Sequence, residues 1–203
     1  MRSRPKLHLL LPSLLLVLAT ALVACGGGGE SDEDEVVDAI DYALTSTDPK
    51  ACEEQMTQAF SEQTFRVEGA SAVEMCEQNA RAEESPNDPV EVTDVEIEGA
   101  RATADVAFTG DGEISGQVLA MALVEEDGDW KLDEITGFAE FDRDKLVEET
   151  VKGFESGESP AGPRVLDCIR ETYRGMSRSE FEEIWFQGSA EAEIEILESC
   201  KRR

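Results

Sequence analysis

Histidine is almost absent from this 203-residue sequence, since His8 is the only one. It lies in an apolar N-terminal stretch, so the chain after residue 24 contains no imidazole. Ser-His-Asp and Cys-His catalysis, histidine general bases and histidine-ligated zinc or iron sites all require that group. The sequence therefore excludes these classes of active site after residue 24. Catalysis there would have to use carboxylates, tyrosine or lysine.

Basic residues are also scarce, with 18 Lys and Arg against 46 Asp and Glu and a formal net charge of −28. The only basic cluster after the N-terminal stretch is Lys201-Arg202-Arg203. Nucleic-acid binding depends on neutralising phosphates, so we expect no nucleic-acid partner. The acidic surface could hold cations or a basic partner. We favour the simpler interpretation, in which it keeps the protein soluble and away from an anionic membrane.

Motifs of common catalytic and cofactor sites are missing as well. The chain has no phosphate-binding loop, dinucleotide fingerprint, nucleophile elbow or zincin helix. Its cysteines include no Cys-x-x-Cys pair, which disfavours a thiolate metal site. We therefore expect no cofactor, no metal and no set of catalytic residues.

Five cysteines are present, and after Cys25 four of them remain: Cys52, Cys76, Cys168 and Cys200. An even number in an exported chain is typical of disulfides, and four cysteines allow three connectivities. Their spacing favours Cys52–Cys76 and Cys168–Cys200. Each bond would close a loop of about 25 to 33 residues and stabilise the fold by roughly 3 to 4 kcal/mol.

The N-terminal 24 residues have the composition of an export signal, with three basic residues before a mostly apolar run. That run ends in Leu22-Val23-Ala24-Cys25, which resembles the lipobox of bacterial lipoproteins. The resemblance implies cleavage before Cys25 and a lipid on the new N-terminal cysteine. An uncleaved membrane span is the alternative, but Pro12, Ser13 and Thr20 interrupt a run that only just reaches the ~20 apolar residues needed.

Residues 25–35 combine glycines with a run of acids, which is the composition of a flexible, self-repelling tether. Cleavage before it removes three basic residues and no acid, so the mature chain is three charges more negative than −28. If disordered, the ten residues after Cys25 could hold the following domain up to about 30 Å from a lipid surface.

The sequence pattern predicts an α+β domain over residues 36–140. Apolar residues recur at helical spacing over 33–46, then over 48–60 where Asp48 and Pro49 provide the start, and again from Ser71. Four predicted strands follow the breaker at 85–89. The first changes phase at Thr93-Asp94, which predicts a bulge, and the third, Ile114 to Val124, is apolar on both faces. The sequence predicts N-terminal helices packed on a four-stranded antiparallel sheet.

The order of these elements, and the turn and strand start at residues 126–132 (Glu-Asp-Gly-Asp-Trp-Lys-Leu), resemble the nuclear transport factor 2-like family. The resemblance implies a cone in which a curved sheet wraps a long N-terminal helix and leaves a pocket. In SnoaL-like cyclases and ketosteroid isomerases, which are relatives, that pocket serves proton transfer. An α+β meander of another family remains the alternative.

The rest of the chain is helical. We expect a helix and linker over 141–163 and a small all-α unit over 164–203, stapled by Cys168–Cys200 because such a short segment has a thin core. Phe181, Trp185 and Phe186 lie on one of its short helices. Three large apolar groups exceed what so small a unit buries, so we expect them to form an interaction surface.

Candidate general bases for a pocket reaction are weak. Asp94, Asp105 and Asp133 lie in predicted strands, and Tyr42 in the first helix could act as a donor. Asp105 and Asp133 have the phase of the solvent face of their strands, and none of the three matches a catalytic motif.

The sequence thus favours a non-enzymatic protein, anchored by lipid on Cys25 outside the cytoplasm, that binds a small ligand or an envelope protein. One alternative is a pocket enzyme of the SnoaL or ketosteroid isomerase type that uses a carboxylate base. Another is a structural or cation-binding role for the acidic surface.

Overall fold

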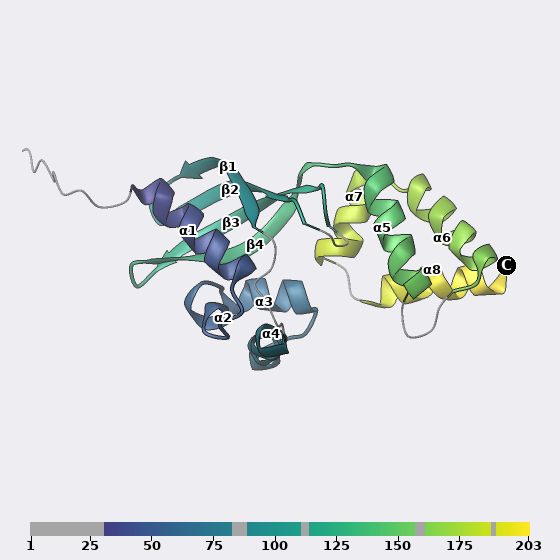
Figure 1. The fold of residues 1–203 in the computed structure, drawn as a ribbon, viewed down its shortest axis with the longest axis horizontal. Coiled ribbons are helices and arrows are strands. Elements are labelled where there is room, and N and C mark those ends of the chain that lie inside the picture. The colour runs from purple at the N-terminus through teal and green to yellow at the C-terminus, as the bar shows by residue number, and fades with distance from the viewer. Residues whose placement is uncertain (1–30, 83–88, 111–113, 157–160, 188–189) are drawn as a thin grey trace, which may run out of the picture.

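A computed structural model describes residues 31–82, 89–110, 114–156, 161–187 and 190–203 (Figure 1). The predicted export signal, the Leu22-Val23-Ala24-Cys25 motif and the tether up to residue 30 lie outside the described residues. Within the described part, no helix combines the length and the apolar character that crossing a bilayer requires.

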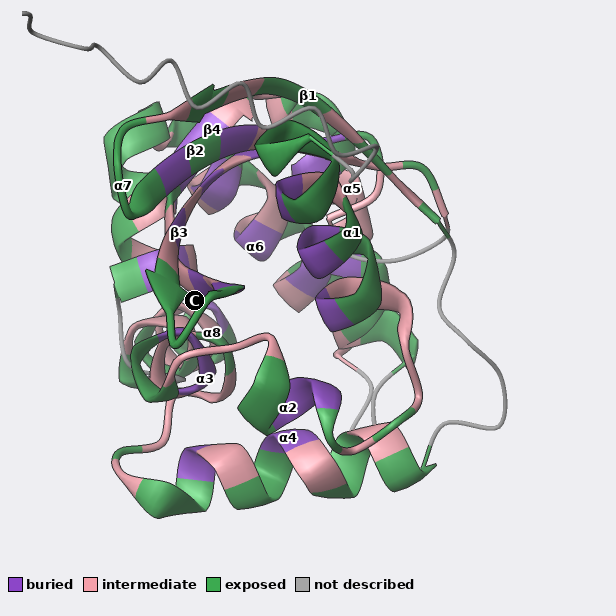
Figure 2. Ribbon diagram, turned by 90° about the vertical axis from the view of Figure 1, so that its left-hand side faces the viewer, coloured by how far each residue is buried: buried purple, intermediate pink, exposed green. Residues whose placement is uncertain are grey.

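Helix α1 (Asp32–Thr45) begins where the sequence predicts a helix. Ser31 and Asp34 form a capping box, in which each side chain accepts a hydrogen bond from the other residue's backbone N–H. The helix buries one apolar face, which includes Val36 and Ile40, against strands β1 (Val90–Ile97) and β4 (Asp129–Glu140). Figure 2 shows the strands arching over this helix.

The helix expected over 48–60 is instead two helices, α2 (Ala51–Glu54) and α3 (Gln58–Phe65). Between them the chain pairs with the sheet, because Thr57 donates its backbone N–H to the Leu132 carbonyl at 2.8 Å and Leu132 donates to the Gln55 carbonyl at 2.9 Å. The Thr57 side chain then caps α3. The prediction of one helix starting at Pro49 was wrong because hydrogen bonding to a distant strand interrupts the local pattern.

Helix α4 (Ala70–Ala82) packs beside α3, and a disulfide between Cys52 and Cys76 joins α2 to α4. Its exposed face points away from the sheet in Figure 2. A second disulfide joins Cys168 to Cys200. These are the two pairs that the spacing favoured. Disulfides persist in oxidising compartments, so they indicate a location outside the cytoplasm.

The sheet contains strands β1 (Val90–Ile97), β2 (Arg101–Phe108), β3 (Val118–Glu126) and β4 (Asp129–Glu140), paired antiparallel in sequence order. The α+β class with a four-stranded antiparallel sheet is confirmed. The expected bulge is present, since the β1–β2 register shifts between Thr93 and Glu96 and Asp94 has a φ of 50°.

The outer edge of β4 is closed by side chains from two different helices. Gln63 of α3 donates to the Ile135 carbonyl at 2.9 Å and accepts from the Ile135 N–H at 2.7 Å. Glu182 accepts from the Phe138 N–H at 3.1 Å, and Arg178 donates to the Phe138 carbonyl. Gly137 permits this approach, because a Cβ there would lie 2.8 Å from the Glu182 carboxylate.

Partial burial acts to raise the pKa of Glu182. The hydrogen bonds from Arg178 and from the Phe138 N–H, together with the charge of Arg178, outweigh that effect and hold the pKa below its usual value. Glu182 therefore remains an ionised acceptor for the β4 edge.

Among the described residues, five helical segments follow the sheet: α5 (Arg143–Ser156), α6 (Pro163–Gly175), α7 (Arg178–Glu182), the π-helical η1 (Glu183–Gln187) and α8 (Ala190–Arg202). They lie together at one end of the molecule in Figure 1. Helix α6 packs against both α5 and α8, and η1 contacts α3, α8 and β4.

An aromatic cluster joins these helices to the sheet. The ring of Phe138 lies 4.8 Å from that of Phe141 and 4.9 Å from that of Phe186. Phe181 lies 5.3 Å from Phe141 and 5.5 Å from Tyr173. The hydrophobic core therefore continues without interruption from the sheet into the C-terminal helices.

This packing corrects the prediction that Phe181, Trp185 and Phe186 form an interaction surface. Phe181 is completely buried and Phe186 is 8% exposed, so neither side chain is available to a partner. Trp185 is only partly buried. The prediction was wrong because it judged the helix by what its own short unit could bury, whereas the end of β4 and residue 141 supply the missing apolar surface.

Candidate functional site

A cavity of about 330 Å³ lies between the inner face of the sheet and helices α1 to α4. Leu119 and Met121 of β3 line it from the sheet, and Phe60 of α3 lines it from the helices. The Cys52–Cys76 disulfide forms part of its wall. In Figure 2 the strands lie above and to the left, α1 stands opposite, and α2 and α4 lie below.

The local sequence explains why this space is apolar. Alternation along β3 turns Leu119 and Met121 to the same inner face, where they are 1% and 0% exposed. Small side chains on the facing helices, Ala43, Ala51 and Ala80, also line the space. Short side chains opposite a sheet leave room that longer ones would fill, so the hollow follows from these three positions.

Among the described residues that line the cavity, polar side chains occur only around its rim. They are Ser46 and Asp48 after α1, Thr64 on α3 and Asn79 on α4. Asp48 is exposed and is the only charged residue among the described residues that line the cavity. The two cysteines are held in a disulfide and do not titrate. The lining therefore suits binding of an apolar group better than acid–base chemistry.

A second hollow of about 320 Å³ adjoins the cavity, since Thr64, Ile114, Leu119 and Ile135 line both. Its polar wall includes Arg66, which ends α3 in the left-handed conformation with a φ of 55°. The Arg66 guanidinium pairs with Glu193 at 3.0 Å. It also donates to the carbonyls of Ile184 and Trp185 in η1. The positive charge is thus already compensated within the protein.

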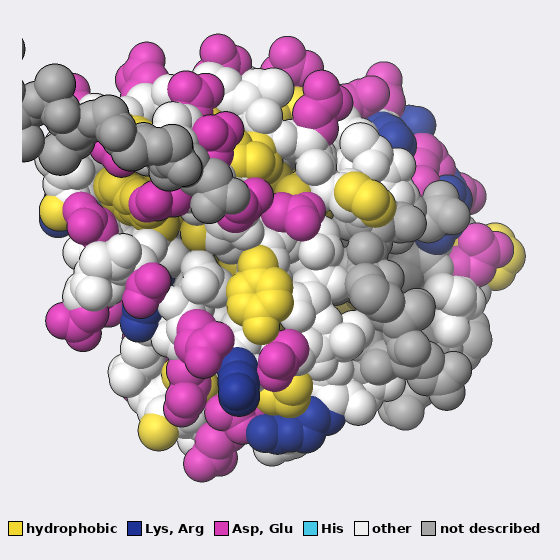
Figure 3. Space-filling view, turned by 60° about the vertical axis from the view of Figure 1, so that its left-hand side comes forward, with side chains coloured by type: hydrophobic (Ala, Val, Ile, Leu, Met, Phe, Trp, Pro, Cys, Tyr) yellow, Lys and Arg dark blue, Asp and Glu magenta, His cyan; other side chains and the backbone are white. Residues whose placement is uncertain are grey.

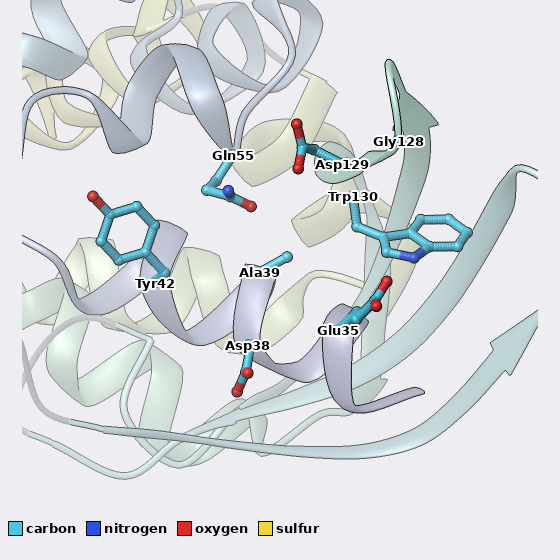
Figure 4. A pocket seen from close by; sticks show the side chains of 8 residues that line it. All are labelled: Glu35, Asp38, Ala39, Tyr42, Gln55, Gly128, Asp129 and Trp130. Carbon is cyan, nitrogen blue, oxygen red and sulfur yellow. The ribbon is translucent and has the colours of Figure 1, made fainter. Parts of the chain in front are cut away.

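A third hollow of about 370 Å³ is acidic and lies at the surface (Figure 4). Glu35, Asp38 and Tyr42 of α1 line it, together with Asp129 and Trp130 of the β3–β4 hairpin. No Lys or Arg of the described residues lines it, which agrees with the wide spread of Asp and Glu side chains in Figure 3. Within the described ranges, no three His, Cys, Asp or Glu side chains are grouped to hold a metal ion.

The structure does not bring the candidate bases together with Tyr42. Asp94 is exposed in the β1 bulge, and Asp133 accepts a hydrogen bond from the Thr57 hydroxyl at 3.0 Å beside the start of α3. Partial burial, followed by the nearby carboxylates of Asp94 and Glu140, raises the pKa of Asp105. None of the three aspartates lines any of these hollows, because strand alternation turns them away from the inner face.

Sequence reasoning missed the residues that line the cavity. Cys52, Phe60 and Cys76 fall in segments where apolar residues recur at helical spacing, but nothing in that spacing separates a cavity wall from ordinary core. No sequence pattern distinguishes the rim residues Ser46 and Asn79 from other polar surface residues. The one available signal was the number of alanines on helix faces that oppose large residues of the sheet.

Residues 46–137, just under half of the chain, match the family model described as low molecular weight antigen MTB12, C-terminal domain. The match begins after α1 and includes α2, α3, α4 and most of the sheet. It stops one residue before Phe138, where the aromatic cluster begins. Neither the comparison with curated proteins nor that with solved structures gave a match. The cavity-bearing part of this chain is therefore similar to the C-terminal domain of antigen MTB12.

Proposed function

We propose that this protein is a lipid-anchored, extracytoplasmic binding protein that holds a small apolar ligand in the cavity between its sheet and helices α1 to α4. The observation that carries the proposal is the lining of that cavity, whose described residues are apolar in its interior and polar only at its rim. A volume of about 330 Å³ lies within the range of pockets that bind small molecules.

The same lining argues for binding without catalysis. Proton transfer in a pocket needs an ionisable group within hydrogen-bonding reach of the substrate. Asp48 is the only such group among the described lining residues, and it lies exposed at the rim, away from the apolar interior of the cavity. A sheet that arches over α1 also supports the nuclear transport factor 2-like cone as the source of the cavity.

The binding proposal predicts that filling the cavity abolishes binding. Residues 26–203 contain every described helix and strand and can be titrated with a neutral, environment-sensitive naphthylamine dye. Ala80→Phe places a ring in the cavity and is expected to weaken dye binding at least about tenfold, because the ring occupies the ligand's space.

Ala82→Phe is the matched control, since Ala82 lies on the same helix, is exposed and does not line the cavity. It should leave the dye affinity unchanged. Circular dichroism checks that both variants remain folded. Equal affinities for the two variants, or no binding by the wild type, would contradict the proposed function.

The anchor is tested separately in cells that process bacterial lipoproteins. Cys25→Ser is expected to abolish incorporation of an alkyne-labelled fatty acid, because serine lacks the thiol that carries the lipid. The variant should also be lost from the membrane fraction in which lipid-modified proteins are recovered. Ser13→Ala, in the same N-terminal stretch, should keep both properties. A Cys25→Ser protein that still takes up the label would remove the anchor from the proposal.

A further inference from the structure

We infer that the ligand of the cavity is an amphiphile with one hydrocarbon chain and an uncharged, hydroxyl-bearing headgroup, and that anionic lipids such as free fatty acids are rejected. This inference rests on the proposed function, because it names the class of ligand that the same cavity takes. It follows from how apolar and polar groups are distributed between the floor and the rim.

The inner wall of the cavity, which we call its floor, has no hydrogen-bonding side chain for a headgroup among its described residues. Met121 is 0% exposed, Leu119 is 1% exposed and Phe60 is 2% exposed, and the Cys52–Cys76 disulfide completes this region. A polar group placed there would lose its hydration without gaining a hydrogen bond. The buried end of the ligand is therefore hydrocarbon.

The rim presents hydrogen-bonding groups that the protein leaves free. Ser46 accepts a hydrogen bond from the Asp48 N–H at 3.0 Å, but its own hydroxyl proton has no acceptor among the described residues. The amide of Asn79 and the hydroxyl of Thr64 likewise have no partner within the described ranges. Hydroxyls and amides at one rim suit a ligand whose head both donates and accepts, as a glycerol or sugar does.

The negative charge at the rim of the cavity disfavours an acidic headgroup. Asp48 carries the only charge among the described lining residues, and no Lys or Arg stands there to offset it. The Asp48 carboxylate also accepts the Lys50 backbone N–H at 3.0 Å, which fixes it at the rim. A carboxylate or phosphate seated beside it would meet like charge with little screening at contact distance.

The adjoining hollow does not reverse this preference. Arg66 is the only Lys or Arg among its described lining residues, and its guanidinium is engaged by Glu193 and by the carbonyls of η1. An anionic head that reached it would compete with the Glu193 carboxylate for the guanidinium. The two hollows together therefore favour neutral heads.

The test compares two probes with the same acyl chain, a monoacylglycerol and the free fatty acid. Both are used below their aggregation limits at neutral pH, with residues 26–203 and displacement of the neutral dye as the readout. The monoacylglycerol is expected to bind at least about tenfold more tightly than the fatty acid. Asp48→Asn keeps an acceptor for the Lys50 N–H and should raise the fatty-acid affinity several-fold without changing that of the monoacylglycerol.

Asp38→Asn is the control, because Asp38 lies outside the cavity and its loss changes only the net charge. A fatty acid that binds as tightly as the monoacylglycerol would overturn the inference while leaving the proposed function intact. The same holds for fatty-acid binding that Asp48→Asn leaves unchanged or that Arg66→Gln weakens. Failure of the dye and of both probes to bind would instead overturn the proposed function itself.

Discussion

Replacing Phe181 by alanine is expected to lower the free energy of unfolding by about 3–5 kcal/mol. The side chain is completely buried, and its ring contacts Phe141 on one side and Tyr173 on the other. Truncation removes the apolar contact between α7 and the segment that leaves the sheet. It also leaves a cavity that two large rings cannot readily fill, so the cost should fall near the upper end of the range for aromatic truncations.

Urea unfolding followed by circular dichroism measures this loss, and Ile194→Ala is the matched control. Ile194 lies in the C-terminal helices but is 56% exposed, so its truncation should change stability by no more than about 0.5 kcal/mol. If Phe181→Ala unfolded at the same urea concentration as the control, the aromatic cluster would not join the helices to the sheet as described.

Removing the Cys168–Cys200 disulfide is the second change with a large expected effect. The double variant Cys168→Ser/Cys200→Ser should lose about 3–4 kcal/mol, because the bond closes a loop with a sequence separation of 32 and its loss restores conformational freedom to the unfolded chain. Removing Cys52–Cys76, with a separation of 24, should cost a similar amount.

Ligand binding distinguishes the two bonds. Cys52 and Cys76 line the cavity, so their loss should weaken dye binding even under conditions in which the protein remains folded. Cys168 and Cys200 lie on α6 and α8, away from the cavity, and their loss should lower stability alone. Unfolding curves and dye titrations of the two double-cysteine variants measure the loss of stability and the loss of binding separately. A binding loss confined to the Cys168–Cys200 variant would contradict the placement of the site.

Local patterns predicted much of the fold because local chemistry decides those features. Capping boxes form at Ser177–Glu180 and at Ser31–Asp34, where a serine and an acid lie three residues apart. Alternation along β2 turns Ala102, Ala104 and Val106 to the core, and the predicted change of phase in β1 marks a real bulge. Each of these features depends on residues within a few positions of one another.

The failures share a different cause, which is contact between residues far apart in the chain. The helix predicted over 48–60 is broken by hydrogen bonds to Leu132. No local sequence pattern predicts that Leu132 is the partner. Phe181 and Phe186 were assigned to the surface because the apolar groups that bury them lie near residue 140. Tertiary contacts outweigh local propensity at such places.

The candidate site was harder to predict than the fold. Leu119 and Met121 read as core residues and are buried, yet whether they meet a packed neighbour or a hollow depends on the size of the side chains opposite. That pairing requires knowing which helix faces the strand. The absence of histidine after residue 24, in contrast, limited the possible chemistry without any structure, because it depends on composition alone.

The side chains that close the edge of β4 have a consequence for self-association. A chain cut after Glu140 would keep all four strands but lose Arg178 and Glu182, so the N–H and C=O of Phe138 would be left without those partners. An open, apolar strand edge is a template on which a second molecule can add a strand, and intermolecular sheets grow from such edges. The helices that follow the sheet therefore protect the β4 edge from aggregation, in addition to contributing apolar residues to the core.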